Sequence, residues 1–235
     1  MSAERFLGGR VIVRQPETGF RAGLDAVMLA AAVPDGATAL ELGAGAGTAS
    51  LCLAARLKDV VVTGLEIDPD LVRLADENAA TNNLSDRVRF AAANIFALPL
   101  AFKREHDCVF LNPPFHGEGQ APPDPSRARA LMDGGTLPGW LEAGMKRAVS
   151  GGYLTAILRA DRLNEALAPL PLTGITVLPL WSKAGEPACR VLVQMRKGSR
   201  APFRLLPGLI LHDETGAYTP HADAILRGES ALALG

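Results

Sequence analysis

The residues best suited to do chemistry are Asn112-Pro113-Pro114-Phe115, which come directly after the apolar run from Asp107 to Leu111. That run reads as a short buried strand, so the tetrapeptide lies where the strand ends. In an open α/β sheet this is the edge that faces ligands. Two successive prolines fix φ twice and remove two N–H donors. The sequence therefore predicts a stiff corner at a ligand-facing edge.

This corner presents two hydrogen-bond acceptors, the side-chain oxygen of Asn112 and the carbonyl of Pro113, beside the ring of Phe115. A planar amino group, on a nucleobase or a side-chain amide, offers two N–H donors to such acceptors. Its lone pair is then directed at an electrophile while the ring stacks on its plane. We predict catalytic roles for these three residues if an electrophile binds upstream. Taken alone, the tetrapeptide is more simply a tight turn beside a core phenylalanine.

A glycine-rich turn from Glu41 to Gly47 supplies the candidate site for the electrophile. Its G-x-G-x-G spacing lets the backbone approach a ligand closely. Thr48 stands where a dinucleotide fold would have its third glycine, so a cofactor without pyrophosphate fits better. Glu66 ends the next strand, where a carboxylate can accept both hydroxyls of a ribose. A ribose without pyrophosphate beside an acidic residue indicates S-adenosylmethionine (AdoMet).

The strand that follows leads to Asn94 and Ile95. Asn94 is placed to bond the amine of the cofactor's adenine, with Ile95 packed on the ring. A capping or turn role for Asn94 is an equally good interpretation of that residue alone.

Short apolar runs alternate with amphipathic stretches from Thr38 onward, and this alternation predicts parallel βαβ units. Two further β-rich runs, Ile175–Leu180 and Val191–Met195, predict an antiparallel hairpin at the sheet edge. The expected fold is a three-layer, doubly wound α/β sheet, mostly parallel. The other expected strands are 10–13, 38–42, 60–67, 88–92, 107–111, 153–158 and 209–211, and the expected helices are 26–33, 48–57, 69–82, 137–149, 163–170 and 220–226.

Composition bounds the function without deciding it. The 235 residues are 48% hydrophobic and 21% charged, which suits one globular domain. A net charge of −1 gives no global basic field, so any RNA contact requires a local patch. Three scattered cysteines and four scattered histidines show no metal-ligand spacing, so we expect no metal site. With no secretory signal or long apolar run, we expect a cytoplasmic protein without a membrane span.

The glycine turn, Glu66, Asn94 and the Asn-Pro-Pro-Phe corner together resemble the class I AdoMet-dependent methyltransferases of the N-P-P-Y/F amino-group type. Within that superfamily the chain resembles, nearly end to end, the bacterial tRNA(Val) adenine-N6 methyltransferases. The family's opening is matched by residues 19–30, and its tail by residues 183–188, 209–213 and 216–219. The resemblance implies a Rossmann-like methyltransferase fold, AdoMet as cofactor and the N6 amine of a tRNA adenine as methyl acceptor.

The resemblance also implies roles for individual residues. It places Asp25 near the cofactor, the target amine on Asn112 and Pro113, and the adenine on Phe115. Phe115 replaces the commoner Tyr, and the family's basic segment is reduced to Arg127-Ala128-Arg129-Ala130. The predicted cofactor residues are Asp25, Glu41, Gly43, Gly45, Gly47, Glu66, Ile67, Asn94, Ile95 and Asn112. The predicted substrate contacts are Pro114, His116, Arg127, Arg129 and Lys183. We expect one domain over 1–235, with an N-terminal cap (1–35), a lid or substrate loop (117–135) and a C-terminal appendage (200–235).

Rival functions remain open at this point. Asn112 to Phe115 with His116 also resembles the guanine-N2 methyltransferases of rRNA, and the glutamine-amide methyltransferases of release factors share the N-P-P motif. A binding module that retains the nucleoside pocket without catalysis is a second alternative. A small-molecule O-methyltransferase is the third, and it would need a metal site or a base near the methyl group.

Overall fold

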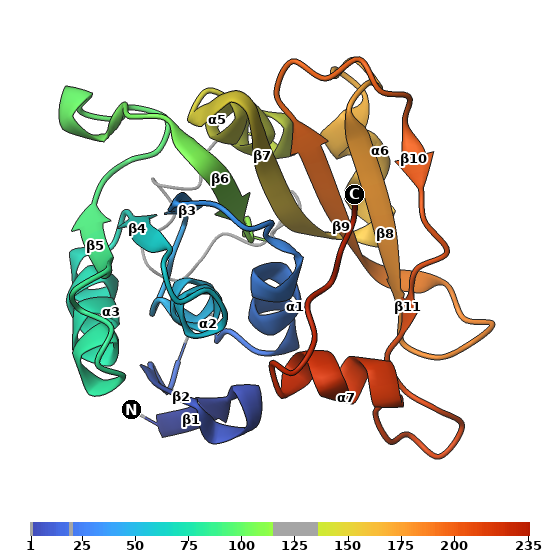
Figure 1. Cartoon of the computed structure of the whole chain (residues 1–235), viewed down its shortest axis with the longest axis horizontal. Coiled ribbons are helices and arrows are strands. Elements are labelled where there is room, and N and C mark those ends of the chain that lie inside the picture. The colour runs from blue at the N-terminus through green and yellow to red at the C-terminus, as the bar shows by residue number, and fades with distance from the viewer. Residues whose placement is uncertain (1, 19–20, 115–135) are drawn as a thin grey trace.

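The fold, given by a computed structural model, is described for residues 2–18, 21–114 and 136–235. Its centre is one large sheet in the order β10-β8-β9-β7-β6-β3-β4-β5, with β11 also paired to β8 (Figure 1). The strands are β3 (Thr38–Leu42), β4 (Val61–Glu66), β5 (Val88–Ala92), β6 (His106–Leu111), β7 (Ala148–Arg159), β8 (Ile175–Trp181), β9 (Ala188–Arg196), β10 (Arg204–Leu205) and β11 (Leu209–Ile210).

The sheet is parallel except at β9, which runs antiparallel to both β7 and β8. The chain lays down β3, β4 and β5 in one direction and then returns to place β6 on the other side of β3. Such a reversal is the point at which open α/β sheets bind ligands. The predicted doubly wound sheet with an antiparallel hairpin is confirmed.

Helices cover both faces of this sheet and bury two separate cores. The first core includes α1, α2 and α3 with the C-terminal α7, and the second includes α5 and α6 (Figure 1). The helices are α1 (Leu24–Ala32), α2 (Thr48–Arg56), α3 (Pro69–Thr81), α5 (Leu137–Met145), α6 (Leu163–Leu167) and α7 (Pro220–Leu226), with 3-10 turns η1 (Leu7–Gly9), η2 (Leu100–Phe102) and η3 (Ala160–Arg162).

Local sequence explains where several of the helices begin. In α3 the side chain of Asp68 accepts a hydrogen bond from Asp70 N at 2.9 Å, and Pro69 occupies the first turn. In α7, Thr219 and Pro220 play the same parts. The N-cap of α2 is Gly47, which has no side chain to offer, so this helix requires a cap from elsewhere in the fold.

An N-terminal hairpin of β1 (Ser2–Phe6) and β2 (Val11–Gln15) is fastened to α3 rather than to the main sheet. Asn82 exchanges hydrogen bonds with both backbone groups of Ile12, at 2.8 and 2.7 Å. Asn78 does the same for Arg14, at 2.8 and 2.9 Å. Residues four apart on a helix share a face, so these two amides match alternate residues of a strand. The two amides thus provide hydrogen-bond partners for the N–H and C=O groups of Ile12 and Arg14 along one edge of β2.

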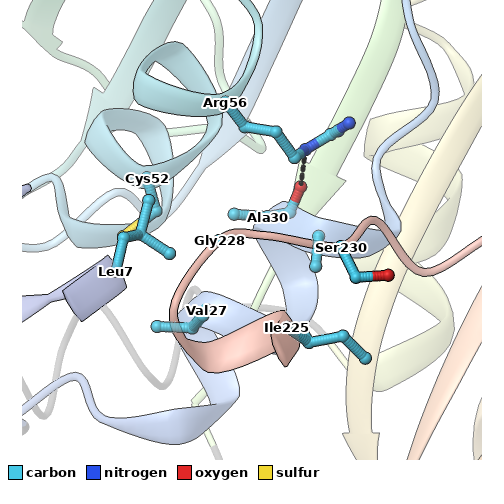
Figure 2. Close-up of a pocket in the computed structure, with 9 residues that line it drawn as sticks. Leu7, Val27, Ala30, Cys52, Arg56, Ile225, Gly228 and Ser230 are labelled. Carbon is cyan, nitrogen blue, oxygen red and sulfur yellow. Dashed lines mark hydrogen bonds between the residues drawn. The ribbon is translucent and has the colours of Figure 1, made fainter. Parts of the chain in front are cut away.

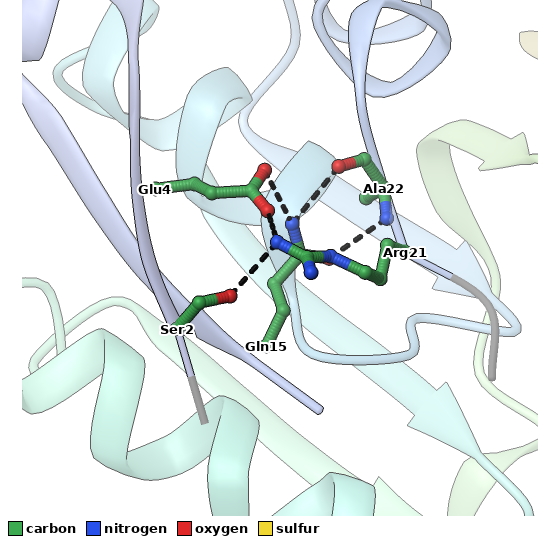
Figure 3. A network of polar contacts seen from close by, with 5 residues as sticks. All are labelled: Ser2, Glu4, Gln15, Arg21 and Ala22. Atoms are coloured by element: carbon green, nitrogen blue, oxygen red, sulfur yellow. Dashed lines mark hydrogen bonds and ion pairs between the residues drawn. The ribbon is translucent and has the colours of Figure 1, made fainter. Parts of the chain in front are cut away.

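A polar network ties the open end of this hairpin to the segment that leads into α1 (Figure 3). Gln15 accepts a hydrogen bond from Ala22 N at 2.7 Å and donates to Ala22 O and Glu4, each at 2.9 Å. Arg21 forms an ion pair with Glu4 and donates to the hydroxyl of Ser2 at 2.8 Å. These contacts fix the start of α1 and with it the position of Asp25.

The prediction of a helix over 137–149 is wrong at its C-terminal end. The helix α5 ends at Met145, and Ala148 already pairs with His106 as the first residue of β7. The strand then shifts register, so that Tyr153 pairs with Cys108 and the intervening residues bulge outward. Gly151, at φ 77°, accommodates this bulge. The predicted strand 153–158 is therefore only the second part of β7.

A small cavity lies between α1, α2 and α7, bordered by Cys52, Arg56 and Ser230 (Figure 2). Its volume is about 10 Å³, which is room for one water molecule rather than for a nucleoside. Arg56 closes one side by donating to Ala30 O at 3.3 Å. Within the described ranges, no helix is both long and apolar enough to cross a membrane.

Candidate active site

The predicted cofactor turn and the Asn-Pro-Pro corner lie side by side at one edge of the sheet. Leu42, the last residue of β3, pairs in register with Leu111 at the end of β6. Gly43 and Asn112 therefore follow directly on neighbouring strands. On the other side Leu42 pairs with Leu65, so Glu66 is the next residue along β4. The edge where the strand order reverses thus brings together the glycines, a carboxylate and the amide.

The glycine turn has the backbone that its spacing predicts. Gly43, Gly45 and Gly47 all have positive φ, at 74°, 55° and 85°. Gly43 N and Ala44 N both donate to Leu65 O, at 2.8 and 3.0 Å, which anchors the turn to β4. At Gly47 a side chain would also collide with the core, because an added methyl group would lie 2.6 Å from Phe90 Cζ.

Glu66 lies at the expected edge, and its carboxylate is already bonded to the turn. It accepts hydrogen bonds from Gly45 N at 2.8 Å, Ile67 N at 2.8 Å and Asp68 N at 3.1 Å. A carboxylate has about four lone-pair sites, so capacity remains for a hydroxyl donor. Glu66 therefore links the shape of the glycine turn to any ligand it binds.

Glu41 lies beneath the glycine turn rather than at its mouth, with 3% of the residue exposed. Its Oε2 accepts hydrogen bonds from Ser50 N at 3.0 Å and from the Ser50 hydroxyl. It thereby supplies the N-terminal cap that Gly47 cannot give to α2. Burial, reinforced by the nearby charge of Glu66, raises the pKa of Glu41 to about 8. At neutral pH its carboxyl is mostly protonated.

Asn112 is half-buried at the end of β6, followed by a buried Pro113 and a half-buried Pro114. Its Oδ1 is buried and, among the residues the structure describes, has no hydrogen-bond partner. A buried acceptor without a donor costs free energy, so an orphan of this kind in a native protein requires an explanation, of which a catalytic role is one. The Thr48 hydroxyl, at the start of α2 beside the turn, is a second orphan of this kind.

Asn94 and Ile95 lie in the segment that follows β5. Asn94 Oδ1 accepts a hydrogen bond from Phe96 N at 2.9 Å, which is the turn-forming interpretation of this residue. An amide oxygen accepts two hydrogen bonds, so a role toward adenine is compatible with this turn. Ile95 is partly buried against the second core.

Asp25 lies in the first turn of α1 and forms an ion pair with Arg190 of β9, at 2.9 Å. The two side chains are 20% and 29% exposed, so the pair is partly shielded from solvent. Arg190 also donates a hydrogen bond to Cys189 O, so its guanidinium contacts both α1 and its own strand. Lys183 is exposed in the loop between β8 and β9. Four predicted site residues, Phe115, His116, Arg127 and Arg129, lie outside the described residues.

Trp140 of α5 reaches the glycine turn from the second core and was missed by the sequence reasoning. A methyl group added at Gly43 would lie 3.1 Å from Trp140 Cη2. The indole meets Phe96 edge to face, with ring centroids 5.6 Å apart and planes at 89°. A single aromatic residue in an amphipathic helix reads as a core residue, so no sequence signal marked it.

Comparison with known proteins decides the family. Residues 23–131 match the family model for the methyltransferase small domain. The chain is 32% identical to a tRNA1(Val) (adenine(37)-N6)-methyltransferase from Porphyromonas gingivalis, over 94% of this chain and 92% of that protein. The chain belongs to the tRNA1(Val) (adenine(37)-N6)-methyltransferase family. A relative of the same name from Aeromonas salmonicida is 28% identical, covering 88% of this chain and 89% of its own.

A solved structure supports the fold of this methyltransferase family member. The crystal structure of a predicted O-methyltransferase from Agrobacterium tumefaciens superposes with a TM-score of 0.75 at 29% identity. It covers 89% of this chain and 98% of its own. The predicted resemblance and the Rossmann-like methyltransferase fold are thus confirmed, and the protein is a methyltransferase.

Membership of a methyltransferase family implies AdoMet as the methyl donor, and the site residues suit it. AdoMet carries a sulfonium and an ammonium group, and the charge of Glu66 lies near enough to Glu41 to contribute to the raised pKa of Glu41. The positive charges of AdoMet would be attracted to the Glu66 carboxylate at this edge. The glycine backbone approaches without side chains, and the Thr48 hydroxyl has capacity for a ligand.

Proposed function

We propose that this protein transfers the methyl group of AdoMet to the exocyclic N6 amine of an adenine in tRNA. The observation that supports it best is the orphan Oδ1 of Asn112, buried one residue beyond a strand pair that ends at the glycine turn. The names of the relatives supply the acceptor class, since they are described as adenine(37)-N6 methyltransferases of tRNA1(Val).

The corner suits an amine better than a hydroxyl. An exocyclic amine has two N–H donors, and the Asn112 oxygen and the Pro113 carbonyl are two acceptors at adjacent residues. A hydroxyl has one hydrogen and would leave one acceptor unsatisfied, at a cost of about 1–3 kcal/mol if that acceptor is buried. Rigid prolines hold the acceptors in place before the base arrives, so little ordering is required on binding.

When bound, AdoMet supplies an electrophilic methyl carbon on sulfur. Asn112 and Pro113 hold the amine so that its lone pair points along the bond to be broken. Displacement at that carbon would form the N–C bond as the C–S electron pair goes to sulfur, leaving S-adenosylhomocysteine, and the methylated amine would then release one proton to solvent. Catalysis is chiefly alignment, which by itself can supply about 7–11 kcal/mol. We further propose that Glu66 holds the ribose and that Asn94, Ile95 and Ile67 border the adenine.

An adenine in a tRNA loop requires little free energy to reach the site. A loop adenine is already partly unstacked, so moving it into the site costs less than flipping it out of a duplex. We propose that Phe115 stacks on this base and that Pro114, His116, Arg127, Arg129 and Lys183 contact the RNA. A tRNA acceptor would place the protein in the cytoplasm.

The test is incubation with methyl-labelled AdoMet and, separately, unmodified tRNA, rRNA or a release factor. We expect label in tRNA only, recovered as N6-methyladenosine in nucleoside digests analysed by mass spectrometry. N2-methylguanosine from rRNA, or methylglutamine from the release factor, would replace the proposal with one of its rivals. Binding of AdoMet without transfer to any acceptor would favour the non-catalytic module.

A further inference from the structure

We propose that Trp140 contacts the cofactor: with Phe96 and Ile67 it forms an apolar slot for the purine ring at the β4–β5 end of the site. The inference rests on the proposed function, because it assumes a nucleoside cofactor on this edge. Trp140 lies outside every motif of the sequence. It belongs to α5, on the opposite face of the sheet from α2, the helix that follows the glycine turn.

The placement of the indole comes from two independent contacts. Its ring lies so close to Gly43 that a methyl group added there would be 3.1 and 3.2 Å from Cη2 and Cζ3. The same ring meets Phe96 edge to face at 5.6 Å. Phe96 belongs to the segment after β5, whereas Gly43 follows β3. Trp140 therefore spans the two strand ends between which β4 presents Glu66.

Exposed apolar side chains at the same place indicate what the slot binds. Ile67 is 46% exposed and Phe96 is 37% exposed, both large hydrophobic residues. They follow neighbouring strands, since Glu66 pairs with Ala92. Ile67 directly follows Glu66, and Phe96 lies two residues after Asn94, to whose Oδ1 its backbone N–H donates. Apolar side chains interleaved with a few hydrogen-bonding groups are complementary to a flat ring with a polar rim, such as a purine.

The order of the strands along the edge indicates how far the purine of the cofactor would lie from the methyl acceptor. Asn112 on β6 must meet the methyl group, the glycine turn on β3 is next, Glu66 on β4 follows, and Phe96 comes after β5. The cofactor has the same linear order of sulfonium, ribose and purine. Ile67 and Phe96 thus lie on the side of the glycine turn away from Asn112, and Trp140 extends from Phe96 back to Gly43. We therefore expect Trp140 to act on cofactor affinity rather than on transfer itself.

Intrinsic fluorescence can test this contact directly, because the chain has only two tryptophans. Trp181 ends β8, which β7 and β9 separate from β6, and its indole donates to Pro207 O at 3.2 Å. In Trp181→Phe the emission comes from Trp140 alone. We expect a saturable change of this emission on titration with S-adenosylhomocysteine. In Trp140→Phe, where Trp181 remains, the same titration should leave the emission unchanged.

Affinity gives a second readout. Trp140→Ala should weaken S-adenosylhomocysteine and adenosine by the same factor, about tenfold, which corresponds to about 1.4 kcal/mol. Trp140→Phe keeps a ring against Phe96 and should lose much less, and Trp181→Ala should bind as the natural protein does. Circular dichroism establishes that each variant is folded. If Trp140→Ala does not fold, the Trp181→Phe titration decides.

Two results would overturn the inference. One is an unchanged affinity of folded Trp140→Ala for S-adenosylhomocysteine. The other is an emission of Trp181→Phe that does not change at saturating S-adenosylhomocysteine. Neither depends on the acceptor. A protein that binds S-adenosylhomocysteine with the expected response of Trp140, yet transfers no methyl group to tRNA, would overturn the proposed function and leave the slot in place.

Discussion

The side-chain amide of Asn78 donates a hydrogen bond to Ala46 O in the glycine turn, at 3.0 Å, from a fully buried position on α3. The same amide exchanges two hydrogen bonds with the backbone of Arg14 in the N-terminal hairpin. One side chain thus connects three segments: the hairpin, α3 and the turn that we assign to the cofactor. The neighbouring Asn82 holds the hairpin in the same way without touching the turn.

This arrangement predicts different effects for two similar substitutions. Asn78→Ala and Asn82→Ala each leave backbone groups of β2 without partners, and we expect each to lower the free energy of unfolding by about 1–3 kcal/mol. Only Asn78→Ala also releases Ala46 O, so it alone should weaken S-adenosylhomocysteine binding. Chemical denaturation and calorimetric titration of both variants measure the two effects. Equal affinities in the two variants would show that Asn78 does not position the turn.

The raised pKa of Glu41, about 8, predicts a pH dependence of stability. In the unfolded chain this carboxyl loses its proton near pH 4.5, and in the folded protein it keeps it to about pH 8. Between these values the folded state binds the extra proton, so the free energy of unfolding should fall as pH rises through this window. Glu41→Gln should remove that part of the slope. Denaturation of both proteins at pH 5 and pH 8 checks it, and parallel slopes would contradict the assigned protonation.

The same carboxyl predicts a proton released on cofactor binding. A positive charge placed near Glu41 favours its ionised form and lowers its pKa. At pH 7 we therefore expect AdoMet binding to release up to one proton, detected as a dependence of the calorimetric heat on the ionisation enthalpy of the buffer. Glu41→Gln should bind without this release. A buffer-independent heat in the natural protein would indicate that the cofactor's charges lie away from Glu41.

Gly47 should be the least replaceable glycine of the turn. At φ 85° a side chain costs about 1–2 kcal/mol through backbone strain alone, and the clash with Phe90 adds to it. Gly185 is the matched control, since it has φ 83° and, among the described residues, no atom would lie within 4 Å of a methyl group added there. We expect Gly47→Ala to lower the thermal midpoint well below that of Gly185→Ala. Similar midpoints would mean that Phe90 moves aside easily.

Most of the sheet could be predicted from the sequence because its strands are short apolar runs bounded by turn residues. The glycine turn and the Asn-Pro-Pro corner were found for the same reason, since both are local signals. Their adjacency was inferred from the expected order of the strands. In the structure it follows from the pairing of Leu42 with Leu111. The predicted domain boundaries stay a prediction.

Features that depend on long-range contacts were missed. The strand β1 is polar and mixed, and it forms only by pairing with β2, itself fastened to α3. The end of α5 is set by pairing of Ala148 with β6, which overrides the local helical pattern. Trp140 reaches Gly43 across the fold, and the capping of α2 by Glu41 crosses from a strand to a helix. No local pattern encodes these contacts.

The buried oxygen of Asn112 is the feature on which the proposed methyl transfer depends most, and one comparison of variants tests its role. Asn112→Ala is assayed for methyl transfer to tRNA and for S-adenosylhomocysteine binding, with exposed Asn164→Ala on α6 as the matched control. We predict that Asn112→Ala loses at least about a hundredfold in transfer, the lower range for a group that aligns or stabilises the reacting atoms, while its affinity changes less than threefold. Transfer at the rate of Asn164→Ala would contradict the role of Asn112 and the assignment of the site.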